Sequence, residues 1–464
     1  MRDRFKAQFR LNFEARPMLK HRIFEAGVVV ALLLATFSGI GAQQKEIITS
    51  GIQLGFGARA IAMGGAYTSV GGDYSSSFWN PATLRDIKRV EVYGSLSHLA
   101  RQNDFGLQDS TSFFTPFGRR NEENFTKFND FGLAYPVPTI RGSLVLSFGF
   151  NRIKSYDSNF DFRTFNNTPD DRLNQAWREL ERGSLNAWTL AGAVDVSPNV
   201  TFGVGLNFWT GGSNFESTFI EVDVDDVYRP EDGFDFNSQT IEETIDSEIS
   251  GFNAKFGGVF RVGPMLRLGA TISTPITFKV EEESSFIHGF EFDDGTFADE
   301  PPELTAPIYK IQSPWSFAGG ASLHLLNIVF SGDVEYNDWS QIRYETEPPV
   351  DSTITTRARE NRLFRDNYRA TARVHLGAEF TLPLTGLSFR AGYFRDPSVF
   401  QDANPDEDKQ FLSAGIGLLV DKQVRLDATY VHGFWKNFND DLEDTLYEED
   451  IKVNKVFVSL AFRF

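Results

Sequence analysis

Short segments in which apolar and polar residues alternate recur along most of this chain, and they limit its fold more than any other feature. Residues 143–152 are an example, because Leu144, Leu146, Phe148 and Phe150 are apolar and most residues between them are small or polar. Neighbouring side chains of a strand point to opposite faces, so such a segment has one apolar and one polar face. Repeated segments of about ten residues with this pattern are typical of strands that cross a membrane.

The connections between these segments follow a second pattern. Every other connection is a short turn, such as residues 197–199, and the remaining connections are long and polar. Bacterial barrels have short periplasmic turns and long external loops, and a soluble β-sandwich is not expected to sort its loops in this way. We therefore predict an all-β fold, a 14-stranded antiparallel transmembrane β-barrel. Its strands are expected near residues 89–99, 128–136, 142–156, 185–196, 200–213, 249–262, 266–280, 314–324, 328–340, 368–381, 387–395, 410–420, 424–435 and 454–464.

The composition agrees with membrane strands and not with membrane helices. The mean hydropathy is −0.28, and no run after the N-terminal region is long and apolar enough to form a helical span. The 46 Phe and 39 Gly favour pleated strands with outward rings and close packing. The absence of Cys fits an oxidising compartment. The net charge of −18 excludes nucleic acid as a partner, because its phosphates would repel the chain.

The N-terminal region has the parts of a secretory signal peptide. Lys20 and Arg22 supply a positive start, residues 26–37 are apolar, and residues 39–42 are small residues suited to cleavage. We expect a signal peptide over residues 1–42 and an exported mature chain. Met18 is an alternative start site, in which case residues 1–17 are not translated.

Aromatic residues lie at many strand ends, where a ring with a polar tip suits the lipid headgroup level. We expect this position for Trp188, Trp209, Trp315, Trp339, Trp435, Tyr93, Tyr135, Tyr156 and Tyr393. The chain ends on Phe464 after apolar residues at every second position. Such an ending resembles the signal read by the outer-membrane barrel assembly machinery, which we expect as a partner.

Two long loops carry further features. Residues 170–182 have apolar residues at helical spacing, which predicts a short amphipathic helix over the mouth of the barrel. The first long loop contains Phe105, Phe113, Phe114 and Phe117. These rings suit an external groove for apolar ligands, and packing that closes the loop is the alternative.

Residues 43–88 do not follow the strand pattern and contain a distinctive motif. Its parts are Gly57-Ala58-Arg59-Ala60, then Ala62-Met63-Gly64-Gly65-Ala66-Tyr67, and then Trp79-Asn80-Pro81-Ala82. Residues 55–60 also match Gly-x-Gly-x-x-Ala, but no strand and helix flank them as a dinucleotide site requires. The motif resembles that of the FadL/TodX (OMPP1) family of outer-membrane transporters, including its PorV-like branch.

The resemblance implies a hatch over residues 43–88 that plugs a barrel of residues 89–464. The hatch residues it singles out are Gly57, Ala58, Arg59, Gly64, Gly65, Asn80, Pro81 and Ala82. In this interpretation Pro81 fixes a turn and Asn80 bonds to barrel backbone, and direct contact with a ligand is the alternative. The resemblance also implies passive uptake of hydrophobic molecules, such as long-chain fatty acids or aromatic hydrocarbons, with lateral release at a kink in an early strand. Gly149 is the kink candidate, and packing against the hatch is its alternative role.

Strand parity places charges of both signs inside the barrel. The basic residues are Lys255, Arg261, Arg267, Arg373, Arg390 and Arg425, and the inward set also includes Asp333, Glu335, His375, Glu379 and Asp427. These groups can form ion pairs that brace the barrel and hatch, because neighbouring strands bring opposite charges together. The alternative is that surplus cations attract the carboxylate of an amphiphilic ligand.

The sequence contains no Gly-x-Ser-x-Gly, HExxH or P-loop motif, and its six His are scattered. We therefore expect no enzymatic activity, no cofactor and no metal site. The leading hypothesis is an outer-membrane transporter gated by its hatch, with lipid and a hydrophobic small molecule as its partners. The alternative is a PorV-like scaffold that helps secretion systems attach cargo at the cell surface.

Overall fold

The computed structural model describes residues 53–107, 114–117, 120–168, 171–226, 237–349, 356–442 and 445–464. The predicted signal peptide and the first part of the predicted hatch therefore lie outside the described residues. None of the helices in these ranges is long and apolar enough to cross a membrane.

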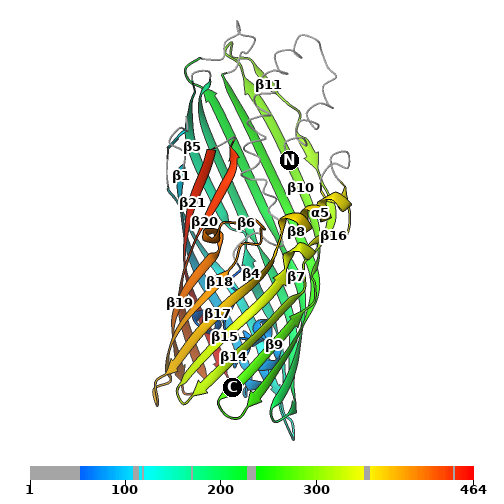
Figure 1. The fold of residues 1–464 in the computed structure, drawn as a ribbon, viewed down its shortest axis with the longest axis vertical. Coiled ribbons are helices and arrows are strands. Elements are labelled where there is room, and N and C mark those ends of the chain that lie inside the picture. The colour runs from blue at the N-terminus through cyan, green and yellow to red at the C-terminus, as the bar shows by residue number, and fades with distance from the viewer. Residues whose placement is uncertain are drawn as a thin grey trace.

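Fourteen antiparallel strands form a closed wall within the described ranges, as predicted (Figure 1). Pairing of the first with the last, Glu91↔Arg463 through Leu107↔Tyr447, closes the barrel. The wall strands are β1 (Glu91–Leu107), β3 (Arg120–Val137), β4 (Leu144–Ser155), β6 (Asp171–Ser197), β7 (Val200–Asp223), β8 (Ser238–Val262), β9 (Leu266–Ser273), β14 (Ser316–Leu325), β15 (Ile328–Asp338), β17 (Ala370–Thr381), β18 (Leu387–Asp396), β19 (Lys409–Val420), β20 (Val424–Leu442) and β21 (Thr445–Arg463).

Several strands rise far beyond the length a membrane requires. β6, β7 and β8 have 27, 24 and 25 residues, whereas about 9–11 residues suffice to cross a bilayer. Shorter strands continue the wall on the side of the long loops. They are β2 (Phe114–Phe117), β5 (Ser158–Thr168), β10 (Thr277–Glu291), β11 (Phe297–Asp299), β12 (Glu303–Thr305), β13 (Ile308–Gln312) and β16 (Arg343–Tyr344).

Two predictions about elements are wrong. Residues 171–182 belong to β6 and not to a helix, because β5 and β7 pair with both edges of this segment. Its buried residues Leu173, Gln175 and Trp177 follow the strand period of two. The predicted strand 266–280 is divided into β9 and β10 at Thr274–Ile276, where Pro275 interrupts the pattern.

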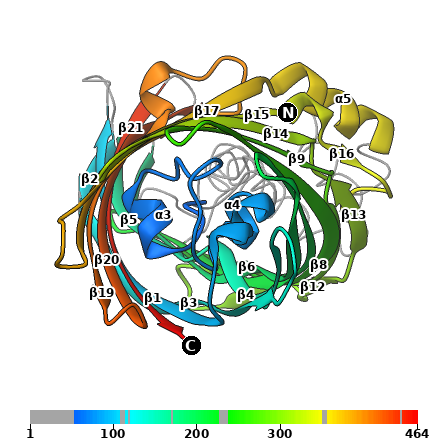
Figure 2. The same ribbon diagram turned by 90° about the horizontal axis from the view of Figure 1, so that it is seen from below.

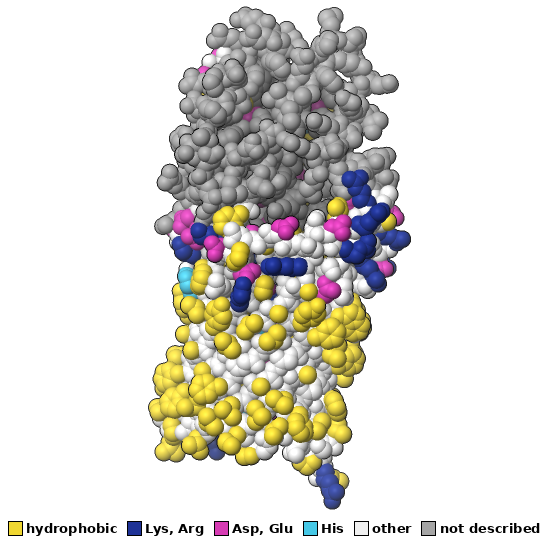
Figure 3. Space-filling view, viewed as in Figure 1, with side chains coloured by type: hydrophobic (Ala, Val, Ile, Leu, Met, Phe, Trp, Pro, Cys, Tyr) yellow, Lys and Arg dark blue, Asp and Glu magenta, His cyan; other side chains and the backbone are white. Residues whose placement is uncertain are grey.

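An apolar belt covers the lower half of the barrel on the face that Figure 3 shows, and a band rich in charged side chains lies above it. The belt consists of outward residues that are about half exposed, such as Phe148, Phe202, Phe330, Leu376 and Ile416. Such a surface suits the hydrocarbon core of a bilayer and not water.

The predicted headgroup position is wrong for five aromatic residues. Trp209, Trp339, Trp435, Tyr93 and Tyr156 are each less than 9% exposed and pack inside the barrel. In contrast, Trp315 and Tyr135 are 42% and 46% exposed, as a position facing lipid requires. The three buried Trp continue the parity of the inward face of their strands.

Residues 53–88, called the hatch segment below, lie inside the ring of strands (Figure 2). The segment contains α3 (Ala58–Ala62), α4 (Ser76–Trp79) and η1 (Pro81–Asp86), and Phe56, Tyr67 and Tyr74 in it have no exposed surface. The other helices of the described residues lie in the long connections of the barrel. They are η3 (Trp339–Gln341), α5 (Arg357–Asn367) and η4 (Pro405–Glu407).

The wall approaches the hatch segment closely because glycines face it. A Cβ added at any of these positions would lie closer than 3.0 Å to a hatch atom. They are Gly132 and Gly149 against Tyr74, Gly203 against Ala82, Gly257 against Asn80, Gly269 against Thr68, Gly377 against Met63, Gly392 against Gly64 and Gly415 against Ala62. The hatch segment therefore packs directly against the wall backbone at these glycines, where larger side chains would collide with it.

Candidate functional site

The hatch segment begins with a tight helix that glycines delimit. Gly57 precedes α3 with φ of 90°, and Gly64 and Gly65 follow it with φ of 62° and 73°. Residues other than glycine are strained in this region. The Gly64 carbonyl shares a hydrogen bond of 2.7 Å with His375 Nδ1, and the Ala58 carbonyl accepts from Thr429 Oγ1 at 2.6 Å. Both ends of α3 are thus bonded to wall side chains.

Asn80 ties the second half of the hatch segment together. Its Nδ2 donates to the carbonyl oxygens of Thr68 at 2.7 Å and of Gly258, in β8, at 3.2 Å. Its Oδ1 accepts from Ala82 N at 3.0 Å, and Pro81 is the first residue of η1. The triplet thus holds a turn and contacts barrel backbone.

Arg59 joins the hatch segment to the wall through a buried ion-pair cluster. Its guanidinium contacts the Glu379 carboxylate at 2.6 and 2.8 Å. Glu379 also accepts from Arg390 Nε at 2.5 Å. Asp427 then accepts from Arg390 at 2.8 Å and from Arg425 at 2.9 Å. Opposite charges alternate through this cluster, which compensates for the loss of water around each group.

Asp73 is the acidic group of the hatch segment that faces this cluster. Burial alone would raise the pKa of its carboxyl, but Arg425 and Arg59 outweigh burial, and the pKa lies below its ordinary value. Tyr67 Oη also donates to it at 2.9 Å. Asp73 is therefore ionised, and its attraction to Arg425 and Arg59 helps to hold the hatch segment against the wall.

The other predicted lumen cations differ in their surroundings. Arg267 pairs with Asp86 of the hatch segment at 2.6 Å, and Arg261 donates to Thr201 at 2.9 Å. Arg373 pairs with Asp396 at 2.6 Å, and Lys255 Nζ donates to the Phe78 carbonyl at 2.6 Å. Of the six cations, Lys255 and Arg373 line a cavity, whereas the other four brace the wall and hatch segment.

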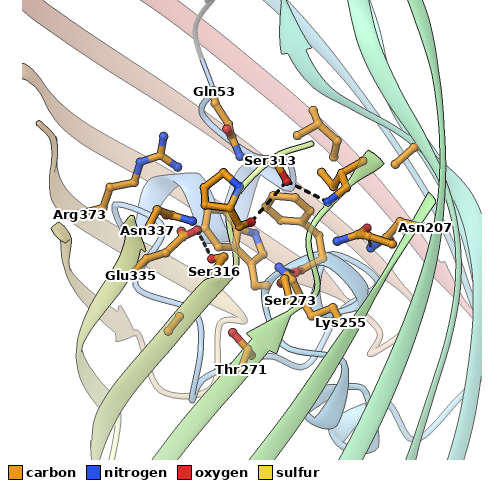
Figure 4. A pocket seen from close by; sticks show the side chains of 18 of the residues that line it. Gln53, Asn207, Lys255, Thr271, Ser273, Ser313, Ser316, Glu335, Asn337 and Arg373 are labelled. Carbon is orange, nitrogen blue, oxygen red and sulfur yellow. Dashed lines mark hydrogen bonds between the residues drawn. The ribbon is translucent and has the colours of Figure 1, made fainter. Parts of the chain in front are cut away.

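A cavity of about 150 Å³ lies between the hatch segment and the wall (Figure 4). It reaches Asn337 and Trp339 at the end of β15, so it opens toward the side of the long loops. Apolar side chains supply much of its lining, and they are Phe78, Trp79, Ile153, Leu185, Ala187, Trp209, Ile276, Phe278, Pro314, Ala318 and Trp339. Polar side chains complete the lining, and five of them carry a charge: Lys154, Lys255, Asp333, Glu335 and Arg373. The cavity thus combines an aromatic part with placed polar groups, as ligand sites commonly do.

Two amides that line the cavity, Asn207 and Asn253, belong to a chain of hydrogen bonds that runs between strands. Tyr74 Oη donates to Asn151 at 3.1 Å, and Asn151 Nδ2 donates to Thr189 at 3.2 Å. The chain continues from Thr189 to Asn207 at 2.9 Å and from Asn207 to Asn253 at 3.0 Å. Trp209 Nε1 also donates to Asn253 at 2.9 Å. Asn207 and Asn253 are thereby paired with protein groups, so a ligand that contacts them causes little further loss of hydrogen bonding.

The wall is irregular where the cavity meets β4. Pairing between β3 and β4 ends at Asp130↔Asn151, and the register between β4 and β6 shifts between Arg152 and Lys154. Ile153 and Lys154 line the cavity at this point. Gly149 lies in the regular part of β4, where it pairs with Gly132 and Thr189 and faces Tyr74. Its position corresponds to packing against the hatch segment, and the irregularity lies further along the strand.

Some cavity residues had no role in the sequence interpretation. Trp79 is part of the motif that resembles the FadL/TodX family, and Phe78 directly precedes this part of the motif. The sequence predicts Trp209 and Trp339 at the headgroup level and not in a cavity. Parity was the available signal, because Trp209 shares the inward face of Gly203, Gly205 and Asn207. The side chains of the loop residues Phe105, Phe113, Phe114 and Phe117 lie outside the described residues.

Comparison with known proteins gives a consistent result. A family model described as outer membrane protein transport protein (OMPP1/FadL/TodX) matches residues 42–460. The toluene transporter TodX of Pseudomonas putida has a TM-score of 0.56 at 13% identity, covering 89% of this chain and 99% of that one. A Pseudomonas aeruginosa FadL homologue scores 0.55 at 13% identity, covering 90% and 99%.

The toluene transporter TbuX of Ralstonia pickettii scores 0.52 at 15% identity, covering 89% of this chain and 99% of that one. The comparison with curated protein sequences finds no match. Structural likeness at this identity shows the fold, and the family model, which spans most of the chain, shows the family. The chain therefore belongs to the OMPP1/FadL/TodX family of outer-membrane transport proteins.

Proposed function

We propose that this protein takes up small hydrophobic molecules across the outer membrane by passive diffusion, through the cavity between the hatch segment and the wall. The observation that carries the proposal is the aromatic part of this cavity's lining, which residues such as Phe78, Trp209 and Trp339 form. Aromatic and aliphatic side chains supply most contacts in small-molecule sites, so this part of the lining suits an apolar molecule.

The size of the cavity favours a monoaromatic hydrocarbon as the first ligand to test. An engineered apolar cavity of about 150 Å³ in another protein binds benzene, and the cavity here has about that volume. Two of the similar structures are toluene transporters, and a third is described as a monoaromatic hydrocarbon channel. A long-chain fatty acid needs more room, so it is the second ligand to test.

Hatch gating is proposed as a local movement and not as removal of the hatch segment. The segment is bonded to β8, β17, β19 and β20 through Asn80, Arg59, Ala62 and Ala58. Breaking all these contacts together would cost far more than shifting Phe78 and Trp79 at the cavity. The irregular region of β4 at Arg152–Lys154 supports lateral release to the membrane, because the cavity already reaches Ile153.

The test is uptake of labelled toluene and of labelled long-chain fatty acid by cells that lack other transporters of this kind. Ala187 lines the cavity and is 2% exposed, so Ala187→Trp fills the space. Ala372 lies on the outward face of β17, and Ala372→Trp is the matched control. We expect uptake with the natural chain and the control and none with Ala187→Trp. The proposal would be refuted if cells with the natural chain took up no more of either ligand than cells without the protein.

The scaffold alternative is not favoured. The family model and the similar structures named above are of transport proteins and channels, and the family is one of channels and not of enzymes.

A further inference from the structure

The external helix α5 carries an arginine face that the barrel fold does not require. Arg359, Arg362 and Arg365 are exposed and follow one another at a spacing of three residues, so they are neighbours on one face. The opposite face contains Glu360 and Phe364, which are 2% and 3% exposed. Three like charges side by side destabilise a helix, so this face needs an explanation outside the fold.

The arginines have few partners within the protein. Among the ranges that the structure describes, neither Arg359 nor Arg365 has an ion-pair partner, and Arg362 Nε donates only to the Ala358 carbonyl at 3.3 Å. Asp366 is the one exposed acidic residue of α5. A net positive face is unusual on a chain whose net charge is −18.

The position of α5 places this face at the level of lipid headgroups. α5 lies outside the ring of strands, and basic side chains gather over it directly above the apolar belt (Figures 2 and 3). The chain runs from α5 through Tyr368 and Arg369 into β17, where Ala372 pairs with the outward Tyr336. Tyr336 is 45% exposed and pairs with Phe317, which is 43% exposed. Three residues of strand, about 10 Å, separate Arg369 from this aromatic row.

We propose that the arginine face of α5 binds the phosphate groups of a phosphorylated lipid in the surrounding outer leaflet. Guanidinium groups bind phosphate through paired hydrogen bonds and lose little hydration in doing so. A cluster of basic residues beside a membrane is attracted to anionic headgroups, and each residue adds to the affinity. A soluble acidic partner would not need the face to lie beside the apolar belt, so the depth of α5 favours a lipid.

The experiment uses the full chain purified in an uncharged detergent and titrated with diphosphoryl lipid A, with native mass spectrometry counting bound lipid. The test variant is Arg359→Gln with Arg362→Gln and Arg365→Gln. The control changes three exposed arginines elsewhere, Arg89→Gln, Arg141→Gln and Arg163→Gln, so the net charge is the same. A third variant replaces the α5 arginines by lysine, which keeps the charge and loses the paired hydrogen bonds.

We expect the glutamine variant of α5 to lose about a hundredfold in affinity for lipid A. The lysine variant should lose less, and the control should keep the affinity of the natural chain. Unchanged binding by the α5 variant, or an equal loss in the control, would overturn the proposal, as would equal affinity for phosphatidylethanolamine. The unfolding temperature of each variant shows whether it is folded. If the triple glutamine variant unfolds at a lower temperature than the natural chain, the single variant Arg362→Gln replaces it.

Discussion

At the scale of residues, a few buried charges link the hatch segment to the wall. Glu379 accepts hydrogen bonds from Arg59 of the hatch segment and from Arg390 of β18. Parity predicted that Glu379 and Arg390 face inward, because the alternation of β17 and β18 is regular. The partner from the hatch segment was not predictable, since nothing in the sequence gives the distance between residues that lie 320 positions apart.

Substitution Glu379→Gln should leave two buried arginines without a full counter-charge. We expect a loss of about 3–5 kcal/mol in the free energy of unfolding, measured by thermal and chemical unfolding in detergent. Glu303→Gln, at an exposed residue of β12, is the matched control and should change little. A Glu379→Gln protein as stable as the control would show that this cluster does not hold the hatch segment.

The lowered pKa of Asp73 predicts a pH dependence. A carboxylate whose folded pKa is depressed stabilises the protein above its unfolded pKa, about 3.9, and loses this effect as the pH falls through the folded value. The stability difference between the natural chain and Asp73→Asn should therefore stay constant from pH 7 to about pH 4 and shrink only below that. The control is Asp402→Asn at an exposed position. A difference that shrinks already between pH 7 and pH 5 would contradict the ion-pair cluster.

At the scale of elements, the inward glycines of the wall strands allow the hatch segment to pack closely against the wall. Gly392→Ala places a Cβ against the backbone of Gly64, which has no flexible side chain to move away. We expect a loss of about 1–3 kcal/mol and faster proteolysis within the hatch segment. Gly319→Ala is the matched control, because a Cβ there meets no atom within 4 Å. If the two variants were equally stable, the wall at Gly392 would not be in close contact with the backbone of Gly64.

The sequence predicted elements well where period two is unbroken. The prediction for residues 171–182 is wrong because their apolar residues happen to have helical spacing. These residues extend β6 beyond the membrane, where β5 and β7 pair with it. The headgroup position predicted for Trp209, Trp339 and Trp435 is also wrong, because it depends on the residue type and not on the parity of the strand. Continued to the strand ends, parity places all three inside, where Trp209 and Trp339 line the cavity.

At the scale of the whole molecule, the wall and the hatch segment that is bonded to it leave an internal space with an aromatic part among the described residues. The barrel could be predicted from alternation and loop lengths. The cavity could not, because it depends on how nine strands and the hatch segment meet in three dimensions.

The most direct test of this account is a crystal structure of the full chain soaked with bromobenzene, in which anomalous scattering locates the bromine. The account predicts a bromine peak in the cavity, between Phe78 of the hatch segment and Trp209 of β7, and no such peak in Ala187→Trp. Bromine found only on the lipid-facing belt, or bound equally in Ala187→Trp, would contradict the claim that hydrophobic molecules pass through this cavity.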